Sequence, residues 1–249
     1  MIEMETLKLI FDIIGVCFII YLIGYSTFLF LSVTIGATTL YKKKVQDRLM
    51  NKFTDNYFVP ITIVTPAYNE EVTVVQTVKS LLTLDYKLYE IVVVDDGSKD
   101  TTSQQLIDAY NMHPVRRPLH RSIECQPEEF IYESHEQKVP LTLIRKKNGG
   151  KADALNMGIN AAQYPYFICM DADSVLQHDS LRKLVVPVLE EENVVAVGGY
   201  NHGTMGEDME LVVKLHSYCL TNQIPYSIKY ATDAVCWTQV PEKLGDLKK

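Results

Sequence analysis

Two pairs of closely spaced aspartates offer the most specific chemistry in this sequence. Asp95 and Asp96 are adjacent, Asp171 and Asp173 are separated by one residue, and each pair follows a run of β-forming residues. Carboxylates at this spacing repel each other unless a cation lies between them or one of them points elsewhere. Because Mg²⁺ and Mn²⁺ prefer oxygen ligands and commonly share one or two carboxylates with substrate phosphates, Asp171 and Asp173 predict a divalent metal site with a phosphorylated ligand.

A polar turn that contains Tyr68 and Glu70 follows an earlier β-rich run. The carboxylates of this turn and of the Asp95 pair could accept hydrogen bonds from an imide N–H or from ribose hydroxyls, while Tyr68 offers a ring face to a nucleobase. The same residue types are common in loops that lead into helices, where Asp96 or Ser98 would only cap a helix. The residue types alone leave both interpretations open.

A glycine turn, Gly149-Gly150, directly precedes Lys151. Backbone N–H groups and a cation converge at the start of the helix expected there, an arrangement that suits a diphosphate. The turn is not a P-loop, because the full motif is absent and Ala152 follows the lysine, which disfavours kinase or NTPase chemistry. The alternative is an ordinary glycine turn capped by Asn148, with Lys151 in solvent.

Asp208 lies at the start of a stretch, residues 209–220, whose apolar residues have helical spacing. A carboxylate at a helix start usually caps the helix or interacts with its dipole. It could also take up a proton as the general base of a reaction. The sequence alone does not decide between these roles.

Short β-rich runs alternate with amphipathic stretches over most of the chain. This alternation predicts an α/β fold with a mostly parallel sheet covered by helices on both faces, and ligands outside the carboxyl ends of its strands. Residues 111–140 interrupt the pattern and are expected to form an exposed insertion. The expected strands are 61–64, 91–94, 141–144, 166–170 and 194–197, and the expected helices are 72–82, 101–110, 152–162 and 180–190.

The overall composition excludes some classes of protein. A net charge of −7 argues against a nucleic-acid partner, because a nucleic-acid binder needs a basic face. The five cysteines are odd in number and lack the paired spacing of metal ligands, so they indicate neither a disulfide framework nor a zinc site.

The N-terminal region predicts a membrane anchor. The run Leu9–Leu40 is interrupted only by Asp12 and exceeds the ~20 apolar residues that cross a bilayer, whereas a cleaved signal peptide would have basic residues before a shorter run. Lys42, Lys43 and Lys44 follow the run, so we expect a single-pass protein of the cell membrane with its N-terminus outside and its domain cytosolic. The expected divisions are an anchor at 1–41, a linker at 42–59 and a domain at 60–249.

Taken in order, the motifs resemble family 2 glycosyltransferases of the GT-A fold, here preceded by one transmembrane helix. The resemblance extends from about residue 60 to the C-terminus, and the similar enzymes include membrane synthases that extend poly-N-acetylglucosamine, hyaluronan and cellulose. It implies a role for each residue named above. By this resemblance Tyr68, Glu70 and Asp95 hold the uracil and ribose of a UDP-sugar, with Asp96 nearby. Lys151 lies near the diphosphate, Asp171 faces the nucleotide, and Asp173 binds Mg²⁺ or Mn²⁺. The resemblance implies that Asp208 is the catalytic base.

The resemblance implies an inverting transfer of a sugar, GlcNAc or glucose, from a UDP-sugar to a growing polysaccharide or a lipid-linked acceptor. Compared with the family, the chain is shortened between Gly199 and Gly206 and has no Gln-x-x-Arg-Trp motif. Trp237 is not the tryptophan of that motif and is expected in the core or lining the pocket. These departures keep an alternative open, a nucleotide-sugar-binding pseudoenzyme or inactive fragment that acts as an interaction protein.

Overall fold

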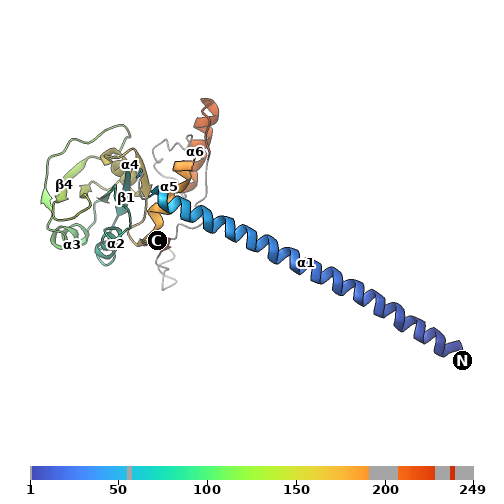
Figure 1. Ribbon diagram of the computed structural model, residues 1–249. Coiled ribbons are helices and arrows are strands. Elements are labelled where there is room, and N and C mark those ends of the chain that lie inside the picture. Colours follow the sequence, from blue (N-terminus) through green and yellow to red (C-terminus); the bar gives the residue numbers. More distant parts are fainter. Residues whose placement is uncertain (1, 55–57, 191–206, 228–235, 239–249) are drawn as a thin grey trace. The chain divides into compact units, whose positions relative to one another are not determined.

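The computed structural model describes residues 2–54, 58–190, 207–227 and 236–238. The chain divides into two compact units, Met1–Asn56 and Tyr57–Lys249. The first unit contains a single long helix, and the second contains a mixed sheet with its covering helices (Figure 1).

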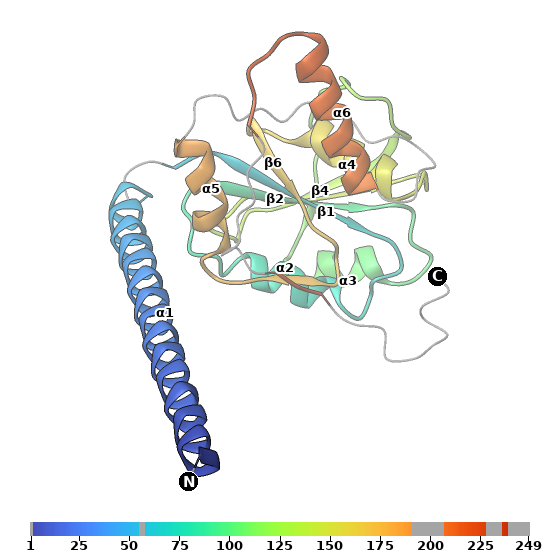
Figure 2. The same ribbon diagram turned by 90° about the vertical axis from the view of Figure 1, so that its right-hand side faces the viewer.

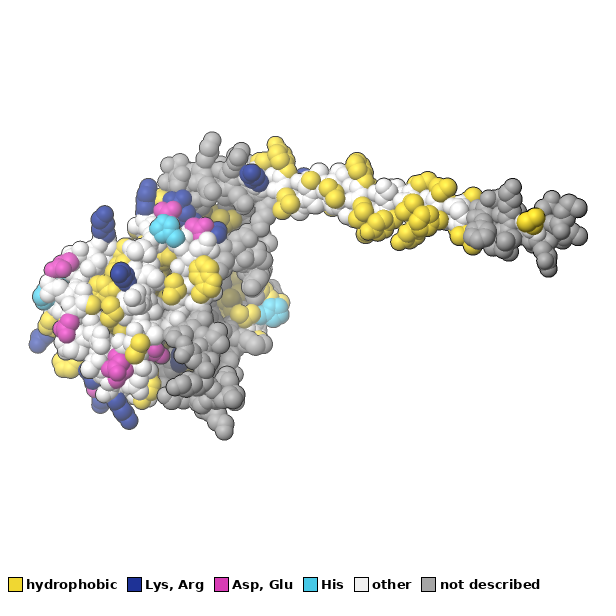
Figure 3. All heavy atoms as spheres, turned by 90° about the horizontal axis from the view of Figure 1, so that it is seen from below, with side chains coloured by type: hydrophobic (Ala, Val, Ile, Leu, Met, Phe, Trp, Pro, Cys, Tyr) yellow, Lys and Arg dark blue, Asp and Glu magenta, His cyan; other side chains and the backbone are white. Residues whose placement is uncertain are grey.

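The first unit is the helix α1 (Ile2–Thr54). Its stretch Ile13–Lys42 has a mean hydropathy of 2.2 and is long and apolar enough to cross a bilayer. The described side chains of this stretch are exposed, and Figure 3 shows hydrophobic side chains along the helix. The helix continues beyond the apolar run to Thr54, through most of the segment that the sequence suggested as a linker.

The second unit is built on a six-stranded sheet in the order β3-β4-β5-β2-β1-β6. The four strands on the β6 side run parallel, and β3 and β4 add to the β5 edge in antiparallel orientation. The strands are β1 (Ile61–Ala67), β2 (Tyr89–Asp95), β3 (His113–Pro114), β4 (Glu128–Ser134), β5 (Leu141–Lys146) and β6 (Tyr166–Cys169).

Helices cover both faces of this sheet, as the alternating pattern predicted. Figure 2 shows α2 (Val74–Leu81) and α3 (Thr102–Ala109) on one face and α4 (Lys151–Ala161) on the other. Alternate residues along the central strands are buried against the two layers. Ile63, Ile91 and Leu143 belong to the cluster under α2 and α3, whereas Val64, Val92 and Ile144 belong to the clusters under α4.

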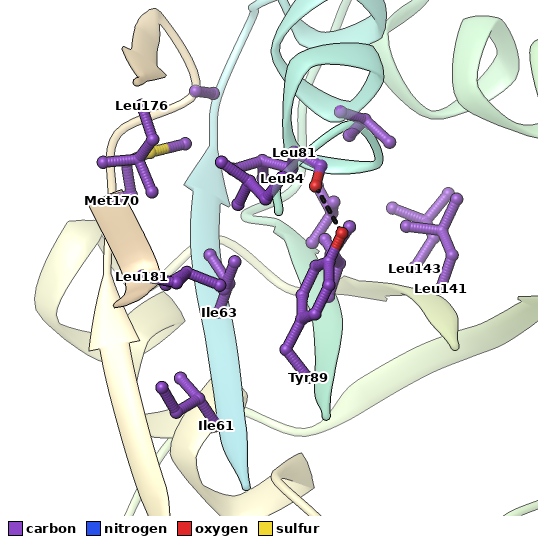
Figure 4. Close-up of a cluster of buried hydrophobic side chains, with 14 of the residues drawn as sticks. Ile61, Ile63, Leu81, Leu84, Tyr89, Leu141, Leu143, Met170, Leu176 and Leu181 are labelled. Carbon is purple, nitrogen blue, oxygen red and sulfur yellow. Dashed lines mark hydrogen bonds between the residues drawn. The ribbon is translucent and has the colours of Figure 1, made fainter. Parts of the chain in front are cut away.

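The two helical layers are fixed to the sheet by specific contacts. In the first layer the Tyr89 hydroxyl donates a hydrogen bond to the carbonyl of Leu81 over 2.8 Å (Figure 4), and burial raises the pKa of Tyr89 to about 12. In the second layer a Cβ at Gly158 would collide with the Val64 side chain. Glycine at this position therefore allows α4 to approach β1 closely.

Residues 111–140 are not the simple exposed insertion that the sequence suggested. They contribute β3 and β4, and Ile131 of β4 is buried. A strand that adds to the edge of a sheet needs no continuous apolar run, because one of its faces remains in solvent. The glutamates of β4, at 128, 129 and 133, interrupt its apolar residues and therefore concealed it.

The remaining described elements follow β6. They are β7 (Ser174–Leu176), α5 (Ser180–Glu190), α6 (Glu207–Thr221) and β8 (Cys236–Thr238). β7 and β8 pair in antiparallel orientation as a second, two-stranded sheet. The strand expected at 194–197 lies outside the described residues.

Candidate functional site

The strand order places a crevice at the carboxyl ends of β1 and β6. The chain builds β1, β2 and β5 outward in one direction and then returns through α4 to add β6 on the other side of β1. In such sheets ligands bind outside the carboxyl ends of the strands where the strand order reverses. The loops after Ala67 and Cys169 therefore lie where a ligand is expected.

A cavity of about 520 Å³ lies at this position. Its lining comes from the end of β1, from the loops that follow β1, β2, β5 and β6, and from the start of α4, so segments distant in sequence converge on it. Six of the predicted site residues line the cavity: Tyr68, Glu70, Asp96, Lys151, Asp171 and Asp173.

The loop after β1 presents an aromatic ring to the cavity. Tyr68 is 45% exposed, so its ring is free to cover a planar ligand. The neighbouring backbone is held in place, because the Asn69 amide donates to Ser98 Oγ over 3.0 Å and the Glu70 amide donates to Thr102 Oγ1 over 2.9 Å. These bonds tie the loop after β1 to the loop after β2.

Asp95 does not line the cavity. Its side chain is fully buried, with one carboxylate oxygen accepting the Ser98 amide over 2.8 Å and the other accepting the Ser103 hydroxyl. Asp95 thus stabilises the turn after β2, and its carboxylate does not line the cavity. The reason is local, since the turn after β2 supplies donors to both of its oxygens. Its contact with a nucleotide remains a prediction.

Asp96 lines the cavity but directs its carboxylate inward. It accepts the amide of Gly149 over 3.0 Å, the amide of Gly150 over 2.7 Å and the ammonium of Lys146. The sequence suggested that the N–H groups of this glycine turn bind a diphosphate. In the structure the N–H groups of Gly149 and Gly150 already donate to Asp96, so these two are not directed at a diphosphate as the sequence suggested.

Lys146 is the buried residue that the sequence analysis missed. Its side chain is fully buried and its ammonium pairs with Asp96 and, over 2.6 Å, with Asp153. In the sequence it is one of three consecutive basic residues, Arg145 to Lys147, which would ordinarily lie in solvent. The alternation of the strand could have indicated its burial, because Lys146 lies on the same inward face of β5 as Ile144. A lysine in that position needs buried acidic partners.

The carboxylates after β6 remain accessible. Asp171 pairs with Lys151 over 2.8 Å, and both side chains are nearly half exposed. Asp173 accepts a hydrogen bond from Ser174 Oγ over 3.2 Å. Between the two aspartates, Ala172 is buried and its carbonyl accepts the Thr77 hydroxyl over 2.5 Å. This anchoring to α2 holds the turn that carries both carboxylates.

The pair Asp171 and Asp173 is the part of the cavity that fits a divalent ion best. Among the described residues no three His, Cys, Asp or Glu side chains are grouped as a metal site. Magnesium sites formed with substrate phosphates commonly use only one or two protein carboxylates, which this turn can supply.

The second sheet lies beside these carboxylates. β8 pairs with β7, which follows Asp173 directly. Burial raises the pKa of the Cys236 thiol, and the charges of Asp171 and Asp173 raise it further. Trp237, which was expected in the core or lining the pocket, is 56% exposed on β8 and does not line the cavity.

The catalytic base implied by the resemblance cannot be placed against the cavity. Asp208 is the second residue of α6, but its side chain lies outside what the structure describes. Its role remains a prediction.

Comparison with known proteins identifies the family. The model of glycosyl transferase family 2 matches residues 62–123 and 127–237 of this chain. The chain therefore belongs to glycosyl transferase family 2. The matched region contains the six-stranded sheet except Ile61, and every described residue that lines the cavity.

Curated relatives indicate a more specific similarity. The chain is 25% identical to the poly-β-1,6-N-acetyl-D-glucosamine synthase of Staphylococcus aureus strain COL over 288 aligned residues, which cover 92% of this chain and 62% of the relative. The synthase of the same name from Staphylococcus epidermidis is 24% identical over the same coverage. The chain thus spans about three fifths of the length of these relatives, and an alignment longer than its 249 residues contains positions without a counterpart in it.

Two solved structures resemble part of the chain. One is the mannosyltransferase PcManGT from Pyrobaculum calidifontis in complex with GDP-Man and Mn²⁺, with a TM-score of 0.43 and 24% identity over 56% of this chain and 34% of that one. The other is S. aureus TarS 1-349 in complex with UDP-GlcNAc, with a TM-score of 0.40 and 20% identity over 59% of this chain and 37% of that one.

Proposed function

We propose that this chain binds a UDP-sugar and transfers its sugar, GlcNAc or glucose, to a growing polysaccharide or a lipid-linked acceptor at a membrane. The observation that carries the proposal is the cavity at the β1–β6 crevice, where an exposed tyrosine and two accessible aspartates meet in a chain of this family. Similarity to the poly-N-acetylglucosamine synthases favours GlcNAc among the donor sugars.

The charges around the cavity support a requirement for Mg²⁺ or Mn²⁺. Among the described residues, four that carry carboxylates line the cavity, and Lys151 is the one lysine described there. A diphosphate would enter an acidic site whose glycine N–H groups are already bonded to Asp96. A divalent ion held by Asp173 would offset the charge that develops on UDP as it leaves.

The other cavity residues then have defined roles. Tyr68 would stack on the uracil, and Glu70 would accept hydrogen bonds from the nucleoside. Lys151 would exchange its partner Asp171 for the diphosphate. Asp95 would act indirectly by fixing the turn after β2. As the base, Asp208 would take the proton of the acceptor hydroxyl while that oxygen attacks the anomeric carbon from the face opposite UDP, which inverts the configuration.

Calorimetry with the 249-residue chain in detergent tests the donor site. We expect UDP to bind with Mn²⁺ or Mg²⁺ and not in EDTA, and Asp173→Ala to weaken binding at least about tenfold, because protein and diphosphate share the ion. Asp108→Ala is the matched control, since it removes an exposed aspartate of α3 that does not line the cavity. Tight binding in EDTA that Asp173→Ala leaves unchanged would disprove the donor site.

A transfer assay separates an active enzyme from a protein that only binds the donor. Radiolabelled sugar from UDP-GlcNAc or UDP-glucose should be incorporated in membranes by the wild-type chain and not by Asp208→Asn. A pseudoenzyme would show the metal-dependent binding of UDP without incorporation.

We also propose that α1 spans the cell membrane once with its N-terminus outside. The support is the apolar stretch Ile13–Lys42 followed by the basic residues Lys43 and Lys44. A protease added to intact cells should remove a tag placed before Met1 and spare one placed after Lys249. The opposite accessibility would contradict both the orientation and a cytosolic supply of donor.

A further inference from the structure

The buried lysine of β5 lies beneath the proposed donor site and has no part in the chemistry assigned above. Lys146 is the largest of the fully buried side chains in the described part of the domain. Lysines are almost never buried without partners. Its three N–H donors are matched by Asp96, by Asp153 over 2.6 Å and by the carbonyl of Lys147 over 2.7 Å. An ammonium enclosed in this way cannot touch a ligand.

Both carboxylates that pair with Lys146 contact the glycine turn. Asp96 accepts the amides of Gly149 and Gly150, and a Cβ at Gly149 would lie 2.5 Å from the carboxyl carbon of Asp153. Gly150 has a φ of +90°, a conformation that L side chains rarely adopt. The turn is therefore enclosed by two carboxylates that one ammonium holds together.

The same turn determines where the cation of the cavity lies. Lys151 is the first residue of α4 and follows Gly150 directly. Its ammonium reaches Asp171 across the cavity over 2.8 Å. A change in the glycine turn would therefore shift the start of α4 and with it the Lys151 ammonium.

The network also reaches the segment before β4. Both oxygens of Asp153 accept the amide of Gln126, over 3.1 and 3.0 Å. Two helical turns further along the same face of α4, Asn160 donates to the carbonyl of Ile123 over 2.7 Å and accepts its amide over 3.0 Å. Residues 124–126 fall between the two segments that match the family model. Lys146 thus connects the cavity to a part of the chain outside that match.

We propose that Lys146 is a positioning residue for donor binding, which holds the Asn148–Lys151 turn so that the Lys151 ammonium faces the donor diphosphate. The assignment of the ligand rests on the proposed function, whereas the control of the turn does not. A stabilising role alone is a poor explanation, because a buried ion pair is often no more stable than apolar residues of similar volume. The network instead selects one conformation of a turn that contains two glycines.

A charge-balanced pair of variants tests this role. Lys146→Met alone would leave two buried carboxylates without a cation, and the domain could fail to fold for that reason. In Lys146→Met/Asp153→Asn the net charge of the buried group is unchanged, because one cation and one anion are removed together. Asp153→Asn alone is the matched control, since it keeps the pair of Lys146 with Asp96 and an oxygen for the Gln126 amide.

Two measurements on the 249-residue chain in detergent separate the outcomes. Hydrogen exchange in peptides covering 147–152 should accelerate about tenfold or more in the double variant but not in Asp153→Asn, while exchange in α2 stays unchanged. UDP affinity in the presence of Mn²⁺ should fall about tenfold to a hundredfold in the double variant and by less than about threefold in the control.

Each result has a distinct meaning. Unchanged exchange at 147–152 and unchanged UDP affinity in the double variant would overturn the inference. Loss of the whole cooperative unfolding transition would overturn it as well, because Lys146 would then stabilise the entire domain. Accelerated local exchange in a chain whose wild type binds no UDP would uphold the control of the turn and refute the donor assignment instead.

Discussion

The aspartates at the end of β2 and those after β6 lie on either side of β1, at the same edge of the sheet. Asp95 and Asp96 are buried, and the oxygens of both carboxylates accept hydrogen bonds from nearby groups of the protein. Asp171 and Asp173 are partly exposed and line the cavity. Both pairs consist of aspartates, and the spacing within each pair is nearly the same. Neither feature therefore explains why one pair is buried and the other is partly exposed.

The difference lies in the donors that each turn provides. The turn after β2 faces Lys146 and the N–H groups of Ser98, Gly149 and Gly150, which together compensate the desolvation of its carboxylates. The turn after β6 is anchored through the carbonyl of Ala172, which leaves its carboxylates directed to the cavity. The partner that the protein supplies to Asp171, the Lys151 ammonium, is itself nearly half exposed, so this carboxylate stays accessible where Asp95 and Asp96 do not.

The largest expected effect comes from removing one member of the buried pair. Asp96→Ala should lower the free energy of unfolding by about 3–5 kcal/mol, because it breaks a buried ion pair and leaves two amides without their acceptor. Asp171→Ala removes a half-exposed ion pair and should cost no more than about 1 kcal/mol. Urea denaturation of the 249-residue chain in detergent, followed by near-ultraviolet circular dichroism, measures both changes in stability.

The comparison would fail if the two substitutions had equal effects on stability. A large loss for Asp171→Ala would mean that the accessible pair also holds the fold together. A small loss for Asp96→Ala would mean that the contacts of Lys146 with Asp153 are sufficient for the buried network.

A smaller effect, at Asp100, separates burial from hydrogen bonding. Asp100 is not fully buried, but its carboxylate accepts the amide of Thr102 over 3.0 Å and the amide of Glu71 over 3.2 Å. Burial acts to raise the pKa of Asp100, but the hydrogen bonds from Thr102 and Glu71 outweigh it and lower the pKa below its ordinary value of 3.8. Asp100 therefore resembles the β2 pair in its hydrogen bonds and the β6 pair in its exposure.

Because its pKa is lower in the folded state, ionised Asp100 stabilises the protein above the unfolded pKa, and this contribution is lost as the pH falls through the folded pKa. Asp100→Asn should lower the free energy of unfolding by about 0.5–1.5 kcal/mol at pH 7. The difference from wild type should disappear in acid below the folded pKa. A difference that stays constant from pH 7 into this acidic range would show that the charge of Asp100 has no part in its hydrogen bonds.

Much of the fold could be predicted because it depends on local patterns. The β-rich runs and the helical spacing between them predicted the four parallel strands and the helices α2 to α5 to within a few residues. The strand β4, which lies between β3 and β5, was missed because glutamates interrupt its apolar residues and because its pairing partner β5 lies further along the chain. Its register is a property of the assembled sheet.

The candidate site divides in the same way. The order of Tyr68, Glu70, Lys151, Asp171 and Asp173 along the chain was sufficient to indicate the family and a common cavity, because parallel strands bring their carboxyl ends to one edge. The order of these residues along the chain does not determine how exposed each side chain is. Whether a carboxylate such as Asp96 faces a ligand or the interior depends on Lys146 and Gly149, about fifty residues away, and only the packing of β5 and α4 against β2 brings those donors to it.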